Sequence, residues 1–240
     1  DPRITFTRGS TATYYDGVTT AKAEENLVQY SQDWTQSYWT KSGSGATGDS
    51  TSAPDGTTTA DLITITSEGN YRGVKADPSA QANTEYTGSI YIKKSNHDYV
   101  RFYIMSFNSG SYLNAFAQRN LNLTNGATIG SDIGTCTTTD VGNGWYRVTV
   151  SGTTHSSANK IRFEVDFTDS TGANAPSTSV ANGSAIFLWG AQLEQRSAPT
   201  AYTPTTTSAI VKYQPVLQTA ASGAARFDHD PVTGESKGLL

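Results

Sequence analysis

Tyrosines and charged side chains alternate with apolar ones in two stretches of the chain, residues 86–107 and 160–167. An aromatic ring can stack on the flat C–H face of a sugar, while charged neighbours hydrogen-bond its hydroxyls. A surface that displays both kinds of side chain therefore suits a carbohydrate ligand. The candidate ligand residues on the polar sides of these stretches are Tyr91, Lys93, Arg101, Tyr103, Arg162, Glu164 and Asp166.

A second interpretation stays open for this face. An ordinary solvated sheet also carries cross-strand ion pairs, which stabilise it by about 0.2–1 kcal/mol each. Such a face shows threonine, lysine and glutamate more often than tyrosines beside arginines. Four further alternating residues extend the same face, or in the case of Phe116 belong to the core: Tyr112, Asn114, Phe116 and Gln118.

Tryptophans occur in a predicted loop and in predicted strands. We expect Trp39, in the loop, to pack at the mouth of the domain, whereas Trp34 in the same loop is a candidate for a contact with sugar. Trp145 and Trp189 fall within predicted strands and are expected to be structural.

Catalytic residues are hard to assemble from this sequence. His97 and His155 fall in predicted loops without a neighbouring nucleophile motif. Glu164 and Asp166 are the only carboxylates paired on one predicted strand face, at a spacing of about 6.6–6.8 Å that is ordinary for a strand. The run around His229 precedes a Pro-Val-Thr-Gly turn, and its consecutive side chains point in alternate directions. We therefore expect no catalysis.

The period-2 alternation predicts an all-β protein. We expect residues 86–107 to form a central hairpin with a turn at Ser95–His97. The segment 160–167 alternates most cleanly, and the mostly apolar segment 184–194 predicts a strand covered on both faces. About ten short strands separated by turns predict two packed antiparallel sheets, a β-sandwich of the jelly-roll kind.

Composition narrows the function classes. The chain has 240 residues, 35% hydrophobic and 16% charged, with 22 Gly and 13 Tyr, which is typical of an extracellular or virion β module. The net charge of −4 without a basic block argues against nucleic acid as a partner. No apolar run is long enough to span a bilayer, so we expect no membrane partner. The single cysteine excludes an intrachain disulfide and a cysteine-based metal site.

Two families resemble parts of this chain. The ITFTR run near the N-terminus and the ARFDHDPVTGESKGLL run at residues 225–240 resemble segments of structural proteins of tailed bacteriophages. The phrases YWTKSG, GWYRVTVSG and FLWGAQLE resemble the frame of jelly-roll carbohydrate-binding modules. The resemblance implies a fibre-type segment at 1–25, a carbohydrate-binding-like sandwich at 26–202, and a linker with a second fibre-type segment at 203–240. The phage pattern usually joins its two segments after a short gap, whereas here the whole sandwich lies between them.

These resemblances also imply a function. The expected protein is a non-catalytic module that holds a polysaccharide or host-surface glycan, carried on a phage fibre as a homo-oligomer and located on the virion or outside the cell. Modules of this class often carry structural Ca²⁺, for which the chain offers loop carboxylates at Asp49, Asp55, Asp61 and Asp169 without EF-hand spacing. The alternatives are a structural virion domain with an assembly interface, and a jelly-roll polysaccharide lyase or hydrolase.

Overall fold

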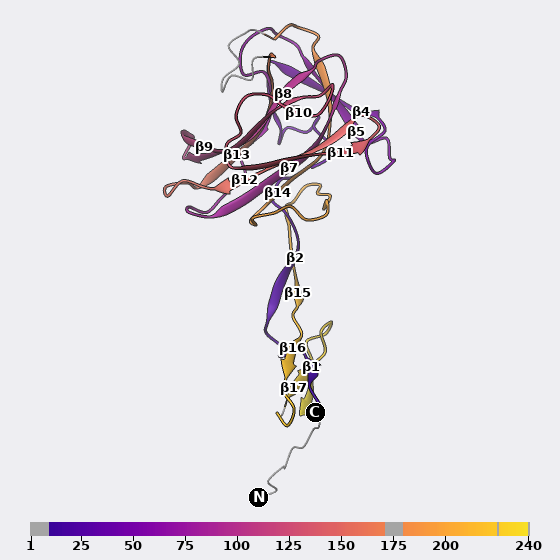
Figure 1. Ribbon diagram of the computed structural model, residues 1–240, viewed down its shortest axis with the longest axis vertical. Coiled ribbons are helices and arrows are strands. Elements are labelled where there is room, and N and C mark those ends of the chain that lie inside the picture. Colours follow the sequence, from indigo (N-terminus) through magenta and orange to yellow (C-terminus); the bar gives the residue numbers. More distant parts are fainter. Residues whose placement is uncertain (1–9, 171–179, 225, 240) are drawn as a thin grey trace, which may run out of the picture. The chain divides into compact units, whose positions relative to one another are not determined.

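Only strands make up the regular secondary structure in the computed structural model, which describes residues 10–170, 180–224 and 226–239. The chain divides into a larger unit, Glu25–Ile210, and a smaller unit formed by Asp1–Glu24 with Val211–Leu240. The prediction of an all-β, two-sheet antiparallel sandwich is confirmed for the larger unit (Figure 1). In the described residues, no helix has the length and hydropathy needed to cross a membrane.

The first sheet of the larger unit has six strands, in the order β10-β9-β8-β13-β6-β3. All neighbouring pairs are antiparallel. The alternating segment 160–167 becomes β13, as predicted, and lies in the middle of this sheet. The strands are β3 (Thr40–Ser42), β6 (Gly73–Ala76), β8 (Tyr99–Asn108), β9 (Ser111–Asn122), β10 (Ala127–Thr128) and β13 (Lys160–Phe167).

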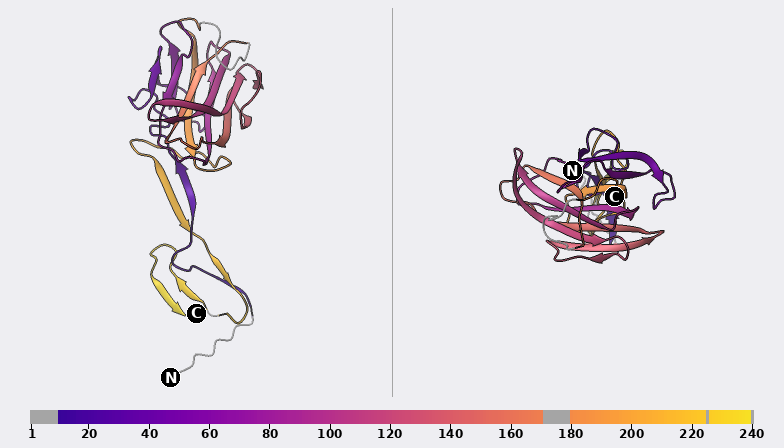
Figure 2. Two further views of the ribbon diagram at one scale, coloured as in Figure 1. Left: turned by 90° about the vertical axis from the view of Figure 1, so that its left-hand side faces the viewer. Right: turned by 90° about the horizontal axis from the view of Figure 1, so that it is seen from above.

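The second sheet also has six strands, in the order β11-β12-β7-β14-β5-β4, and it packs against the first (Figure 2). Its pairs are antiparallel too. The mostly apolar segment near residue 190 forms β14, buried on both faces as expected. The strands are β4 (Ser44–Thr51), β5 (Ala60–Ile65), β7 (Glu85–Lys94), β11 (Thr135–Gly142), β12 (Trp145–Thr153) and β14 (Ala185–Glu194).

A single apolar core fills the space between the two sheets. Its centre contains Phe102 of β8 and Phe163 of β13, whose ring centroids are 4.8 Å apart. Gly88 of β7 approaches this pair from the opposite sheet, since a Cβ built there would lie 3.1 Å from Phe102 and from Ile104. The inward positions of β7 and β8 therefore meet across the core. The alternation in the sequence correctly identified the side of each strand that faces the core, although most side chains on the opposite sides are buried as well.

The predicted hairpin between residues 86 and 107 is wrong, because β7 and β8 belong to different sheets. The backbone N–H groups of Asn96 and His97 both donate to the carbonyl of Ala185 at the start of β14, and the Asn96 Oδ1 accepts from the Ala185 N–H at 2.6 Å. These bonds hold the connection across the edge of the sandwich, so it forms an arch between sheets. Alternation alone cannot distinguish an arch from a hairpin, because both keep one apolar face per strand.

The smaller unit consists of three two-stranded sheets, which pair β1 with β16, β2 with β15, and β17 with β18. Its two chain segments are held together by β1–β16 pairing and by Asp228, whose Oδ1 accepts from the Tyr15 N–H at 3.0 Å. The His229 ring lies against Gly17, where an added Cβ would be 3.0 Å from the imidazole. These strands are β1 (Ala12–Tyr14), β2 (Thr20–Asn26), β15 (Ile210–Pro215), β16 (Gln218–Ala220), β17 (Phe227–His229) and β18 (Ser236–Leu239).

Both terminal segments thus fold as one unit, with the sandwich inserted between them in sequence. The ITFTR run itself lies outside the described residues. At its C-terminal boundary, the larger unit extends to Ile210, whereas the sequence predicted that it ends at Tyr202. The reason is that Thr203 and Thr205 are buried and hydrogen-bonded to sandwich residues, through Gln192 Oε1 and Ser31 Oγ.

The core yields a stability prediction. Phe102→Ala should lower the free energy of unfolding of the larger unit by about 3–5 kcal/mol, because it leaves a cavity beside Phe163. All four tryptophans lie in this unit, so urea unfolding followed by tryptophan fluorescence reports on it alone. The matched control is Tyr112→Ala, at a side chain that is 58% exposed, which should change the same free energy by less than about 0.5 kcal/mol. An equal loss in both variants would contradict this assignment of the core.

Candidate functional site

The outer face of the first sheet contains an open cleft of about 530 Å³. Four neighbouring strands of that sheet, β9, β8, β13 and β6, contribute residues to its lining. The short edge strands β10 and β3 contribute none. Most of the lining side chains are aromatic or charged, and fewer are aliphatic. The residues lining the cleft are Tyr71, Lys75, Arg101, Tyr103, Met105, Phe107, Gly110, Tyr112, Ala115, Gln118, Arg162 and Glu164.

Strand register brings four of the seven residues predicted for the ligand face, Arg101, Tyr103, Arg162 and Glu164, together in the lining of this cleft, with a fifth, Asp166, buried beneath it. Opposite one another on β8 and β13 lie Arg101 and Asp166, and next to them Tyr103 and Glu164. Arg162 pairs with Met105 one step further along. Because β8 and β13 are adjacent and antiparallel, residues from two distant segments share one surface.

A buried cluster of Arg101, Tyr103 and Asp166 forms one part of the cleft floor. Arg101 Nη2 lies 2.8 Å from Asp166 Oδ2, and the Tyr103 hydroxyl donates to the same oxygen at 2.7 Å. The guanidinium carbon is 4.3 Å from the Tyr103 ring centroid, a cation–π distance. Burial, and then the negative charge of Asp166, raise the pKa of Tyr103 well above its usual range. With Tyr103 only 4% exposed, it cannot serve as the open stacking platform that the sequence predicted.

Two other tyrosines have the exposure that stacking requires. Tyr71 is 50% exposed and Tyr112 is 58% exposed, and both line the cleft. The Tyr71 ring centroid lies 5.6 Å from the Arg101 guanidinium carbon, and its backbone has φ of 54°. A left-handed backbone is uncommon for a residue other than glycine and is often found where a side chain has a functional position.

Sequence reasoning missed Tyr71 and Lys75. Tyr71 precedes β6 and lies in no strand, and β6 is too short for alternation to place Lys75. Lys75 is the cross-strand neighbour of Glu164 on β13. Burial, and then the negative charge of Asp166, raise the pKa of Glu164 to about 7. Arg162, at the cleft wall, forms a two-pronged ion pair with Asp77 at 2.7 and 2.9 Å.

Two β-bulges decide which side chains of β9 reach the cleft. The register of β9 against β8 shifts between Ile104 and Met105 and again between Ser106 and Phe107. Tyr112 and Gln118 consequently line the cleft, whereas Phe116 is 6% exposed and packs in the core. Phe116 thus follows the core alternative, and strict alternation along this strand fails because of the bulges.

Tyr91 and Lys93 do not belong to this cleft, because β7 lies in the second sheet. The outer face of that sheet is covered by residues 195–205. The Tyr202 ring packs at 4.6 Å from Trp189 and at 6.4 Å from Tyr91. The Arg147 guanidinium donates to the Thr200 carbonyl at 2.7 Å. The expectation of one continuous ligand face is therefore corrected: Tyr91 packs under a loop, in a cluster with Trp145 and Trp189.

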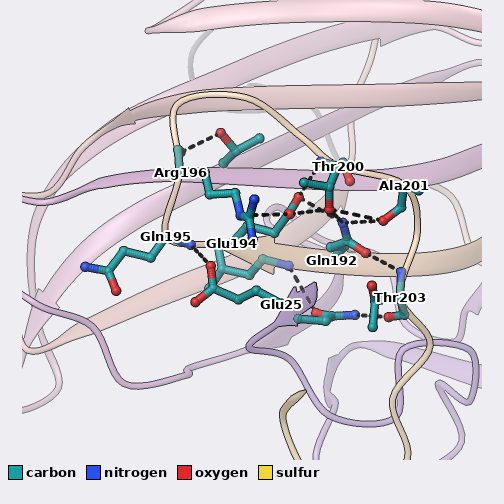
Figure 3. Close-up of polar contacts among 12 residues, drawn as sticks. Glu25, Gln192, Glu194, Gln195, Arg196, Thr200, Ala201 and Thr203 are labelled. Atoms are coloured by element: carbon teal, nitrogen blue, oxygen red, sulfur yellow. Dashed lines mark hydrogen bonds and ion pairs between the residues drawn. The ribbon is translucent and has the colours of Figure 1, made fainter. Parts of the chain in front are cut away.

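Buried polar groups hold that loop in place (Figure 3). The Glu194 carboxylate accepts from the Thr200 N–H at 3.0 Å, from the Thr200 hydroxyl at 2.6 Å, and from Gln192 Nε2 at 2.8 Å. Glu25 Oε2 accepts from the Gln195 N–H at 2.6 Å. Glu194 is fully buried, so it stabilises the fold and does not face solvent.

Trp34 is also placed differently from the expectation. It is fully buried, and its ring centroid lies 4.0 Å from that of Trp39. Its backbone N–H donates to Asp61 Oδ2 at 2.7 Å, which pulls the predicted loop onto the sandwich. Trp34 is thus a core residue, like Trp39. No periodic pattern could indicate this, because the segment around Trp34 contains no strand.

The loop carboxylates considered for Ca²⁺ do not form a ligand set. Among the described residues, no group of three or more histidine, cysteine, aspartate or glutamate side chains is arranged to hold a metal ion. Asp61 accepts from the N–H groups of Trp34 and Asp49, and burial raises its pKa to about 6. Asp55 accepts from Thr57. Asp49 and Asp169 are the other two loop carboxylates that were considered as Ca²⁺ ligands.

Comparisons with known proteins give similarity at the level of architecture. No family model and no curated protein matches the chain. One solved structure with similarity is the enzymatically active domain of tailspike protein 4 of bacteriophage CBA120, with TM-score 0.43 and 12% identity over 71% of this chain and 21% of that one. The CBM22-1 xylan-binding domain of Paenibacillus barcinonensis Xyn10C gives TM-score 0.42 and 15% identity over 75% and 99%.

A third similar structure contains the CBM22-1 and GH10 modules of Clostridium thermocellum xylanase 10B, with TM-score 0.43 and 10% identity over 73% of this chain. The chain spans 29% of that structure and about a fifth of the tailspike domain. None of these similarities assigns a ligand to this chain, which has to be argued from the cleft residues.

The raised pKa of Glu164 predicts a pH dependence of stability. The folded state holds this proton more tightly than the unfolded chain does, whose ordinary value is 4.5. The stabilisation is therefore complete below about pH 4.5 and is lost as the pH rises through about 7. Across that window it should decline by roughly 1–3 kcal/mol.

Glu164→Gln, which cannot ionise, should remove this part of the pH dependence. Urea unfolding by tryptophan fluorescence at several pH values measures it, as the difference between the wild-type and variant curves. Asp61→Asn is the comparison variant, since Asp61 titrates lower, at about 6, and should remove a separate part of the profile. A difference curve for Glu164→Gln that is flat between about pH 4.5 and about pH 8 would contradict the prediction.

Proposed function

We propose that the larger unit binds a polysaccharide or host-surface glycan in the cleft of the first sheet and does not cleave it. The observation that carries this proposal is the pairing of two exposed tyrosines, Tyr71 and Tyr112, with charged and amide groups in one open cleft. Exposed aromatic rings provide flat apolar platforms, and neighbouring donors and acceptors hydrogen-bond hydroxyl groups. An open cleft of this kind can admit an internal segment of a long chain.

The non-catalytic part of the proposal rests on the carboxylates. Asp166 is fully buried and bound to both Arg101 and Tyr103, so it cannot act as a nucleophile or activate a water on a bound sugar. Glu164 is left as the one carboxylate lining the cleft, whereas glycoside hydrolysis generally needs two. No histidine is among the described residues that line the cleft.

Binding predictions follow from the exposed rings. Tyr71→Ala and Tyr112→Ala should each weaken binding by about 1–2 kcal/mol, or roughly 5- to 30-fold, through loss of a stacking platform. A polysaccharide array identifies the ligand, and calorimetry with a short oligosaccharide of it measures the single-site affinity. Tyr213→Ala in the smaller unit, at a side chain that is 59% exposed, is the matched control and should leave that affinity unchanged.

The outcomes separate the three functions considered. Loss of affinity in both cleft variants supports the proposal. No binding to any array glycan supports an assembly surface. Release of reducing or unsaturated sugar ends from a bound glycan would identify a hydrolase or lyase.

The setting we propose is a phage-type fibre, on a virion or outside the cell. Support for it comes from the two terminal segments, which resemble parts of one phage motif and whose described residues fold as one unit. We also propose that this smaller unit associates with its counterpart in other copies of the chain. Each strand of its two-stranded sheets is an edge strand, and such sheets are marginal alone. Only Tyr15 and Ala220 are buried among its described residues, whereas six large apolar side chains are exposed: Val18, Val211, Tyr213, Leu217, Phe227 and Val232.

Substitutions on one face of β15 test the association. Val211 and Tyr213 lie two residues apart on one side of the strand, opposite the Lys212–Glu24 ion pair. Val211→Lys with Tyr213→Lys should convert an oligomer into a monomer in sedimentation equilibrium. The control is Val141→Lys on the sandwich, at a side chain that is 41% exposed, which should not change the assembly. A wild-type chain that stays monomeric at high concentration would refute association.

A further inference from the structure

The strand registers divide the cleft into successive rows across the sheet. Along β8, the cleft-facing residues are Arg101, Tyr103, Met105 and Phe107, each two positions from the next. At about 3.4 Å of rise per residue, these four positions span roughly 20 Å. Each of them has a known neighbour on β9 and on β13, so the chemical character of every row can be read from the pairing.

One half of the cleft is polar. The row of Tyr103 contains Gln118 of β9 and Glu164 of β13, with Lys75 of β6 beyond it. The next row contains Arg101, whose charge is balanced by Asp166 at its back. Tyr71 lies over Arg101 at this end. Hydroxyl groups of a sugar would find donors and acceptors throughout this half.

The other half is apolar on β8 and β9. The row of Met105 contains Ala115 of β9 and Arg162 of β13. The row of Phe107 contains Tyr112 of β9, with ring centroids 5.8 Å apart, and its β13 neighbour Lys160 is not among the residues that line the cleft. Tyr103, Met105 and Phe107 form one apolar cluster with Ala115. This half ends at Gly110, in the turn between β8 and β9.

Arg162 does not make the apolar half polar. Its guanidinium carbon lies 4.2 Å from the Phe107 ring centroid, and its Nε and Nη2 groups donate to the two carboxylate oxygens of Asp77. The cation is therefore neutralised by an acid and stacked on the ring. It closes the wall of the apolar half and leaves Met105, Phe107 and Ala115 as the floor.

From this division we infer that the preferred ligand is a glycan whose sugars carry methyl groups, as O-acetyl esters or as 6-deoxy sugars, and that these methyl groups occupy the Met105–Phe107–Ala115 floor. A fully hydroxylated sugar would leave its hydroxyls without partners there, at a cost in desolvation. A methyl group instead gains contact with sulfur, ring and methyl carbons. This inference rests on the proposed glycan-binding function and specifies its ligand class.

The test uses matched ligand pairs. Each O-acetylated polysaccharide of the array is measured before and after mild alkaline de-O-acetylation, which removes the acetyl groups and leaves the backbone intact. A second arm compares polysaccharides of 6-deoxyhexoses with those of the corresponding hexoses. The methyl-bearing member of at least one arm should bind roughly four- to fifteenfold more tightly, the value for burial of one to two methyl groups.

Variants assign the preference to the floor. Met105→Gln keeps nearly the same side-chain length but adds an amide, and should bring the affinity ratio of the pair close to one. Tyr71→Ala, at the polar end, should weaken both members equally and keep the ratio. Because Met105 is 8% exposed, tryptophan-monitored melting of Met105→Gln is needed to show that the sandwich folds. If that variant does not fold, saturation-transfer NMR on the wild-type complex replaces it, with the ligand methyl protons expected to receive the strongest saturation.

The outcomes distinguish this inference from the function on which it rests. Equal affinities for both members in both arms would overturn the methyl preference and leave glycan binding standing. A preference that survives Met105→Gln, or weak saturation of the methyl protons, would overturn its assignment to the floor. Failure to bind any glycan would overturn both the proposed function and the ligand class.

Discussion

The architecture depends on one connection, the arch at residues 95–98 that carries the chain from β7 in one sheet to β8 in the other. Asn96 fixes it through a side-chain bond to the Ala185 N–H, while the carbonyl of Ala185 accepts from two consecutive N–H groups. Because the arch joins strands of two different sheets, the polar sides of β7 and β8 point to opposite outer faces of the sandwich. The polar residues that alternate along 86–107 therefore belong to two separate outer surfaces of the sandwich.

The two outer faces differ in what covers them. On the second sheet, the loop at 195–205 is held by the buried Glu194 carboxylate and packs Tyr202 on Trp189. On the first sheet no such loop is present in the described residues, and the polar groups instead neutralise one another. Arg101 with Asp166 is a buried ion pair whose Coulomb attraction has to offset the desolvation of both charges. The Tyr103 hydroxyl donates a further hydrogen bond to that carboxylate. The polar groups beneath the cleft are therefore already hydrogen-bonded in part to one another.

The sequence predicted the sandwich and most of its strands because half-buried strands impose strict alternation, as in Lys160–Phe167. It also selected four residues that line one cleft and a fifth, Asp166, that is buried beneath it. It could not give strand order, which places Tyr91 on the other sheet, nor the bulges of β9, which turn Phe116 inward. Tyr71 and Trp34 were misjudged for a related reason. Both lie outside strands, where no local period indicates which way a side chain points. Trp34 is placed by a backbone hydrogen bond to Asp61, and Tyr71 lies against the Arg101 guanidinium.

Because the sandwich is inserted into the smaller unit, it can be replaced as a whole by recombination. The chain leaves the smaller unit at Glu24 and re-enters it at Val211, on strands β2 and β15, which are hydrogen-bonded neighbours. A replacement for residues 25–210 needs only two ends about 5 Å apart, the spacing of paired strands. Recombination at these two points would exchange the larger unit for another domain while the host unit kept its own fold. The larger unit is in this sense a cassette.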